Sequence, residues 1–101
     1  MKIPLNTVIE CLDGLCGRST RILVSAKTHQ VTHFVVKLNQ PPFSEVVVPE
    51  RLILEILHNL IRVRCTQSEL KLLDPFIETN YIQVKVQGLK GLAHIKNTSS
   101  A

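Results

Sequence analysis

The sequence predicts an all-β protein, a small closed or partly open β-barrel of five to six strands with one or two short helical turns. Short runs rich in β-branched residues recur along the first three quarters of the chain, with turn-forming residues between them. The 101 residues suffice for one domain. With three Phe, one Tyr and no Trp, the core has to come from Val, Ile and Leu, which suits a barrel filled by its own side chains. Closure would remove the exposed edges of such a sheet.

The first three strands are expected over Thr7–Cys11, Arg18–Ser25 and Val31–Leu38. The dipeptide Asp13-Gly14 after the first run is a turn signal. The short polar segment 26–30 suits a hairpin connection between the second and third strands. The run VTHFVVKL is the clearest of the three because it is dense in β-branched residues.

A fourth strand is expected over Glu45–Val48, after a segment whose prolines cannot continue a ladder. Pro49 suits the first position of a helical turn. The apolar residues that follow have helical spacing, and they are Leu52, Ile53, Ile56 and Leu57. We therefore expect His58 to cap or end this helical turn.

The next segments predict one strand and one short helix. Ile61–Cys65 alternates between apolar and charged residues, which is typical of a strand. Thr66 and Glu69 have the spacing of a capping box. The helix that they begin has to end before Pro75.

The C-terminal quarter is expected to be an extension of the barrel. Residues 1–75 form the predicted barrel domain, and residues 76–101 follow it. Apolar residues alternate with polar ones over Tyr81–Val86, so we expect a strand at about 80–86. From Gly88 onward the glycines and the polar end of the chain predict a mobile tail.

Charge and composition exclude several classes of protein. The net charge is +4, but the twelve Lys and Arg residues are scattered along the chain. No apolar run approaches the ~18 residues of a membrane-spanning helix, and the first residues do not resemble a signal peptide. We expect a cytoplasmic protein without membrane insertion. Glycine-rich phosphate loops and the common hydrolase motifs are missing from the sequence, so we expect neither an enzyme nor a cofactor.

One pattern matches DNA-binding zinc fingers, namely Cys11-x4-Cys16-x12-His29-x3-His33. A finger needs both histidines one turn apart on a helix. Here His33 lies in a run of strong β character, and an extended segment would separate the two rings by roughly 13 Å. Zinc–nitrogen bonds of about 2 Å cannot bridge that gap. We therefore predict no metal site.

The cysteines support a second interpretation. Three cysteines are an odd number, which argues against a disulfide framework. If Asp13-Gly14 forms a two-residue hairpin loop, Cys11 and Cys16 face each other across two strands and could form a redox pair. Two reduced thiols near a turn are the alternative. Cys65 alternates with the apolar face and is expected to be a core thiol.

The order of segments resembles the PRC-barrel family of small β-barrels, which includes the reaction centre H subunit, the ribosome maturation factor RimM and many stand-alone bacterial proteins. The likeness covers residues 1–75, and the chain is most similar to the stand-alone members. The residues that carry it are Ile3-Pro4-Leu5, Asp13-Gly14 with Gly17, the run 31–37, Val46-Val47-Val48-Pro49 and Ile61–Cys65. The family has no shared catalytic residues. The resemblance implies a docking module that meets protein partners, in some members near RNA.

Three hypotheses of function follow. The first is a non-catalytic adaptor that binds a protein partner of unknown identity. The strand at 80–86 packs either on its own barrel or on a second copy, and we favour the second copy, which gives a homodimer. The alternative is an RNA- or ribosome-associated module that uses basic residues, namely Arg62, Arg64, Arg18, Arg21 and Lys37. The third is a redox- or zinc-responsive protein built on Cys11 and Cys16.

Overall fold

The structure is a computed structural model that describes residues 2–86 and 89–94. The elements in chain order are β1 (Val8–Cys11), β2 (Gly14–Val24), β3 (Val31–Leu38), β4 (Glu45–Pro49), the 3-10 turn η1 (Glu50–Leu52), β5 (Ile53–Leu57), β6 (Leu60–Val63), α1 (Gln67–Lys71), the 3-10 turn η2 (Glu78–Asn80), β7 (Tyr81–Val86) and β8 (Leu89–His94). The all-β prediction is confirmed.

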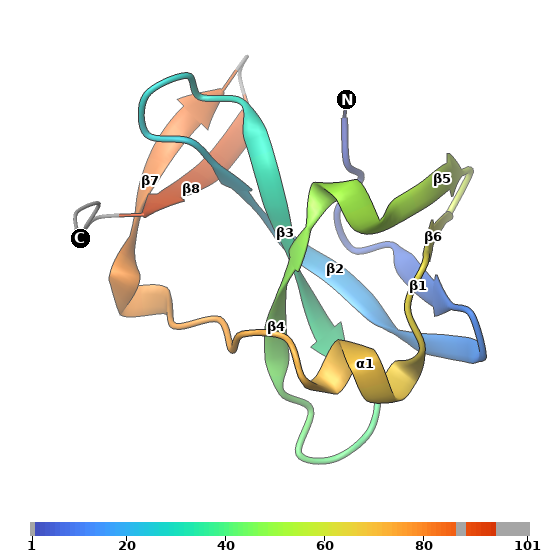
Figure 1. The fold of residues 1–101 in the computed structure, drawn as a ribbon. Coiled ribbons are helices and arrows are strands. Elements are labelled where there is room, and N and C mark those ends of the chain that lie inside the picture. The colour runs from blue at the N-terminus through green and yellow to red at the C-terminus, as the bar shows by residue number, and fades with distance from the viewer. Residues whose placement is uncertain (1, 87–88, 95–101) are drawn as a thin grey trace.

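All described strands belong to one sheet. Its main path is β4-β3-β2-β1-β6-β5, and the β7–β8 hairpin joins it where β8 pairs with β2 (Figure 1). The pairs β1–β6 and β2–β8 are parallel, and the others are antiparallel. Within the described ranges the two ends of the path, β4 and β5, do not pair with each other. The predicted barrel of five to six strands is therefore not confirmed, because the sheet has eight strands and is not closed.

Three of the predicted strands have nearly the predicted bounds, and one begins earlier. Strand β3 spans Val31–Leu38 as predicted, and β1 and β4 differ from their predictions by one residue. Strand β2 begins at Gly14 instead of Arg18 because Cys11 pairs with Gly14. The turn residues of this hairpin are therefore Leu12 and Asp13, and the prediction of Asp13-Gly14 as the loop is wrong by one residue.

The helical spacing after Pro49 predicts the first helical turn correctly and the residues after it wrongly. Glu50–Leu52 forms the expected helical turn, but Ile53–Leu57 forms strand β5. This strand pairs with β6 through a tight turn in which Asn59 has φ of 70°. Asn tolerates that left-handed conformation better than most residues. His58 therefore lies in a β-hairpin turn, and the prediction that it ends a helical turn is wrong.

The predicted capping box is confirmed at the start of α1. The Thr66 hydroxyl accepts from the Glu69 N–H, and the Glu69 carboxylate accepts from the Thr66 N–H. The helix has only five residues, and Leu70 is fully buried in the core. None of the helices in the described ranges is long and apolar enough to cross a membrane.

The C-terminal extension packs on its own chain. Strand β7 confirms the strand predicted at 80–86, but Leu89–His94 forms strand β8, so the prediction of a mobile tail from Gly88 is wrong for these residues. Gly88 and residues 95–101 lie outside the described part of the chain. On the outer face of the sheet a second, smaller apolar cluster contains Leu23 and Val35 together with Leu92, and Phe76 and Tyr81 pack against it.

The main core lies on the inner face of the curved sheet. It combines buried residues from β1, β2, β3, β4, β6 and α1, and the largest are Phe34, Ile9, Ile61 and Leu70. Burying a side chain of this size contributes about 1.5–3 kcal/mol. Aliphatic side chains fill most of this core, as the scarcity of aromatic residues predicts.

A buried serine fixes the N-terminal segment to β2. Ser19 is fully buried, and its hydroxyl donates to the Pro4 carbonyl at 2.7 Å and accepts from the Thr7 N–H at 3.1 Å. Its backbone N–H donates to the Thr7 carbonyl, and its carbonyl accepts from Asn6. Residues 4–7 are therefore held on β2 before the first strand begins.

We expect Ser19→Ala to lower the free energy of unfolding by about 2–3 kcal/mol, because it leaves a buried N–H and a carbonyl without a partner. Urea denaturation monitored by circular dichroism measures this change. Ser68→Ala, at an exposed position of α1, is the matched control and should stay within about 0.5 kcal/mol of the parent. Equal effects of the two substitutions would contradict the role of the Ser19 hydroxyl.

Candidate functional site

Of the five basic residues predicted to contact a partner, two lie side by side in one hollow. Arg18 and Lys37 are cross-strand partners on β2 and β3, and both line one hollow on the outer face of the sheet. The Arg18 guanidinium donates to the Asn6 carbonyl at 3.0 Å. No hydrogen bond or ion pair of the Lys37 ammonium occurs in the described part of the chain. The structure thus brings two of the five residues together.

Arg62 is engaged by acidic residues. Its Nε lies 3.1 Å from Glu10 Oε1, and its Nη1 lies 2.8 Å from Glu55 Oε2. Both carboxylates come from neighbouring strands, since Glu10 and Glu55 are the register partners of Arg62 in β1 and β5. Two carboxylates around one guanidinium make this spot a poor phosphate site. Arg64 is exposed beyond the end of β6.

Arg21 belongs to the seam between the sheet and the C-terminal extension. Its guanidinium carbon lies 5.3 Å from the centre of the Phe76 ring, and its Nη1 lies 3.9 Å from Glu78 Oε2. Its Nε is buried without a hydrogen-bond partner. Arg21 therefore contributes to the attachment of the extension, and it does not line the hollow beside Arg18 and Lys37.

The hollow beside Arg18 and Lys37, which we call the outer groove, has a volume of about 520 Å³. Its apolar walls include Leu15, which is 54% exposed, and Phe43, which is 50% exposed. Phe43 has φ of 59°, a conformation that is rare for a bulky residue. Neither residue was singled out from the sequence. The sequence feature that could have pointed to Phe43 is its position in a loop directly after two prolines.

The strand register extends the outer groove into a longer surface. The pairs Lys37–Arg18, Arg18–Val8 and Val8–Leu60 follow one another across β3, β2, β1 and β6. Leu60 in turn pairs with Leu57 of β5, which is exposed. Basic side chains therefore continue directly into an apolar stripe on the same face.

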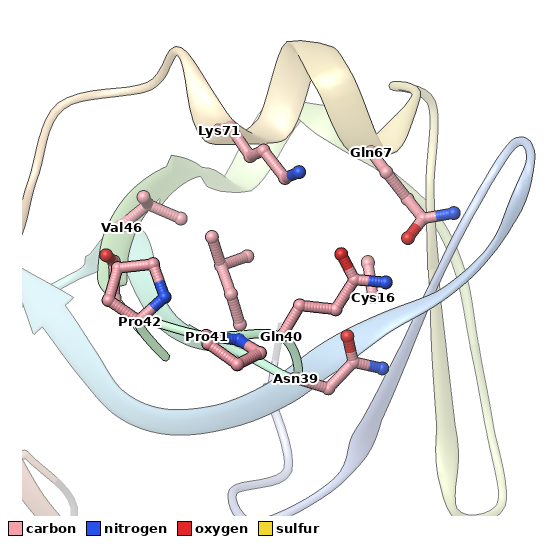
Figure 2. Close-up of a pocket in the computed structure, with 10 residues that line it drawn as sticks. Cys16, Asn39, Gln40, Pro41, Pro42, Val46, Gln67 and Lys71 are labelled. Atoms are coloured by element: carbon pink, nitrogen blue, oxygen red, sulfur yellow. The ribbon is translucent and has the colours of Figure 1, made fainter.

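A second hollow, the loop pocket, lies on the other side of the β3–β4 loop. It has a volume of about 210 Å³ and is bounded by α1 and by residues 38–42. Figure 2 shows Lys71 and Gln67 projecting from α1 toward the loop, with Gln40 and Asn39 rising opposite them. Leu38 and Asn39 line both the loop pocket and the outer groove, so one loop separates the two hollows.

A third hollow, the seam cavity, lies between the sheet and the extension and has a volume of about 680 Å³. Its lining includes His33, Asp74 and Tyr81. Burial and then the nearby Arg51 lower the pKa of His33, and Asp74 partly opposes them. Burial and Asp74 raise the pKa of Tyr81. At neutral pH this cavity therefore presents a neutral imidazole and a neutral phenol.

The predicted face-to-face geometry of Cys11 and Cys16 is wrong. Cys11 pairs with Gly14, and a β-bulge between Ile9 and Glu10 leaves Cys16 without a partner of its own in the register. The bulge turns Cys16 into the core, where its thiol contacts the Ile9 carbonyl at 3.5 Å. All three cysteines are buried and reduced, and the prediction of Cys65 as a core thiol is confirmed.

The three thiols lie close enough to affect one another. Burial is the largest cause that raises the pKa of Cys11 and of Cys16, and an interaction between these two thiols modifies both values. Burial and the Cys11 thiol raise the pKa of Cys65 to about 12. Because the thiolate is the reactive form, this environment disfavours both nucleophilic attack and metal binding at neutral pH.

The two histidines of the zinc-finger spacing do not lie on a helix. His33 lies in β3, and His29 lies in the preceding turn with φ of 60°. Over residues 2–86 and 89–94, no group of three or more His, Cys, Asp or Glu side chains has an arrangement that could hold a metal ion.

We expect the three thiols to react with iodoacetamide at pH 8 at least about a hundredfold more slowly in the folded protein than in denaturant. The folded-state pKa of Cys65 lies above its ordinary value of 9.0. Its contribution to stability is therefore complete below pH 9.0 and is lost as the pH rises toward 12. Mass spectrometry measures the labelling. Urea denaturation of the parent and of Cys65→Ala between pH 9 and pH 12 measures how the free energy of unfolding changes with pH. Rapid labelling of Cys11 or Cys16 in the folded state would contradict the assignment as inert core thiols.

No family model matches this chain, and no curated protein matches its sequence. The resemblance to the PRC-barrel family rests on the residues of the sequence itself and stays a prediction.

Proposed function

We propose that the chain is a non-catalytic interaction module of the PRC-barrel type that binds a segment of another protein in the outer groove. One observation carries the proposal, namely the exposed apolar side chains of Leu15 and Phe43 beside the basic pair Arg18 and Lys37. Exposed apolar side chains that gather in a concave site are typical of interaction surfaces.

The charges of the outer groove favour an acidic partner segment. Lys37 has an ammonium without a partner among the described residues, and Glu45 opposite it accepts a hydrogen bond from Thr20 at 3.1 Å. An acidic side chain of a partner would pair with Lys37, while an apolar side chain next to it would cover Phe43. Complementary charges of this kind mainly set specificity and association rate.

The backbone of Phe43 supports a role beyond folding. A bulky residue with φ of 59° costs about 1–2 kcal/mol relative to an ordinary conformation. Half of this side chain is exposed, so the fold gains little burial in return. Strain at an exposed aromatic residue is expected where that residue serves binding.

The RNA- or ribosome-associated module remains the alternative proposal. Phe43 beside Arg18 and Lys37 offers an aromatic ring and two cations, which suits single-stranded nucleic acid. The engagement of Arg62 by Glu10 and Glu55 and of Arg21 by Glu78 reduces the cationic surface. We therefore favour a protein partner.

Affinity purification from the native host with the tagged full-length chain tests the proposal. We expect proteins that co-purify with the parent to drop at least about fivefold with Lys37→Glu and with Phe43→Asn, because each removes a main feature of the groove. Lys27→Glu makes the same charge change at an exposed position of the turn between β2 and β3 and serves as the control. Quantitative mass spectrometry measures the recovery, and a parallel nuclease treatment separates RNA-mediated capture.

Two results would contradict protein docking. The first is the same set of proteins with the parent and both groove variants, and the second is complete loss of these proteins after nuclease treatment. Misfolding is not expected to confuse the result, because Asn tolerates the backbone of Phe43 and should raise the free energy of unfolding by about 1 kcal/mol. Thermal unfolding of each variant checks this point.

We also propose that the chain forms a homodimer through β7. Within the described ranges, β7 pairs only with β8, so one edge of this strand is open to a second copy. Ile82 on this strand is 53% exposed, which leaves an apolar side chain at the open edge. Unpaired edges of this kind are templates for pairing with another chain.

Light scattering after size exclusion tests the dimer. We expect the parent to have the mass of a dimer and Ile82→Lys that of a monomer, because the substitution places a charge in the interface. Leu72→Lys changes an exposed leucine after α1 and should leave the mass unchanged. A monomeric parent at concentrations of about 100 μM would contradict the proposal.

A further inference from the structure

The loop pocket is open, but its walls are fixed by hydrogen bonds. In the β3–β4 loop the Leu38 N–H donates to the Ser44 carbonyl at 2.8 Å, and the Phe43 N–H donates to the Gln40 carbonyl at 2.7 Å. On the other side, the Gln67 N–H donates to Asp13 Oδ1 at 2.9 Å, which ties the start of α1 to the β1–β2 turn. A ligand would therefore enter a largely formed site and would lose little affinity to ordering it.

The size of the pocket limits the ligand. Its volume of about 210 Å³ is somewhat larger than the ~150 Å³ of an apolar cavity that holds benzene. The apolar part of the lining comes from Leu38, Val46, Pro41 and Pro42. Val46 is buried in the core, so this part of the wall is held in place by packing. The pocket thus accepts a short aliphatic or single-ring body.

The charged part of the pocket lining is positive. Lys71 is the one cationic residue of the lining, and the ten lining residues include no Asp or Glu. Within residues 2–86 and 89–94, the ammonium of Lys71 makes no hydrogen bond or ion pair. The amides of Asn39 and Gln40 lie on the opposite wall (Figure 2). These groups offer an ammonium and amide N–H donors to an anion.

We propose that the loop pocket binds a carboxylate attached to a short apolar body. Lys71 pairs with the carboxylate, the amide groups of Asn39 and Gln40 donate to it, and the apolar body packs on Leu38 and Val46. The carboxylate belongs either to a free monocarboxylic acid or to the last residue of a peptide, since both present the same chemistry. This site is separate from the outer groove and does not depend on the protein partner proposed there.

Titrations followed by NMR spectra of the ¹⁵N-labelled full-length chain test the proposal. The probes are benzoate, 4-methylpentanoate and N-acetyl-leucine, and benzamide is the uncharged control. We expect the three carboxylates to shift the amide signals of residues 67–71 and of the residues in 38–46 other than the two prolines, whereas benzamide binds at least about tenfold more weakly. Charged hydrogen bonds of this kind are lost with the charge. Tighter binding of N-acetyl-leucine than of 4-methylpentanoate would indicate a peptide as the source, and the reverse order a free acid.

Substitutions of Lys71 test whether its ammonium binds the carboxylate. Lys71→Gln should weaken benzoate binding about tenfold, and Lys71→Arg should keep most of it, because the cation is retained. Lys37→Gln removes an equivalent charge from the outer groove and should leave benzoate binding unchanged. Lys71 is exposed, so the spectra of its variants should otherwise match the parent. Equal binding of benzoate and benzamide, or unchanged affinity in Lys71→Gln, would overturn the proposal.

Discussion

The architecture depends on strand β2, which has three neighbours. Its 11 residues pair with β1 over the first half, with β3 over most of the length and with β8 at Leu23 and Val24. A straight strand has only two edges, so the partners have to share them. Register shifts near Cys16 and between Ser19 and Arg21 accompany the bend of this strand. Ser19 then holds the N-terminal segment against it.

The two faces of β2 and β3 are buried by different parts of the chain. The inner face carries Phe34 and Val36 into the main core, whereas Val35 on the outer face is covered by the extension. This cover stops before Lys37, which remains exposed. The outer groove is therefore the part of the outer face that the extension leaves uncovered. One short loop separates it from the loop pocket, so two hollows of different character share a wall.

Ion pairs determine which cations of the outer face remain available to a partner. Arg62 and Arg21 face carboxylates, and the fold uses them to join strands and to attach the extension. Exposed ion pairs of this kind contribute little to stability, but they remove cations from the set that a partner can use. Lys37 and Lys71 keep ammonium groups without such partners in the described part of the chain, and each lies beside a hollow. The two lysines beside the hollows therefore remain available to a partner, whereas Arg62 and Arg21 are already engaged.

The sequence by itself determined the elements that local patterns specify. The β-branched run of β3, the capping box at Thr66 and the alternation of β7 each depend on residues close in the chain, and the structure has them where they were predicted. The core position of Cys65 follows from the same alternation. The tertiary structure decided the rest, because it depends on partners far away in the chain. Ile53–Leu57 is a strand because β6 pairs with it, and Leu89–His94 is a strand because β7 and β2 flank it. Arg62 is neutralised by Glu10, 52 positions earlier, and no spacing rule connects two such residues before the sheet has formed.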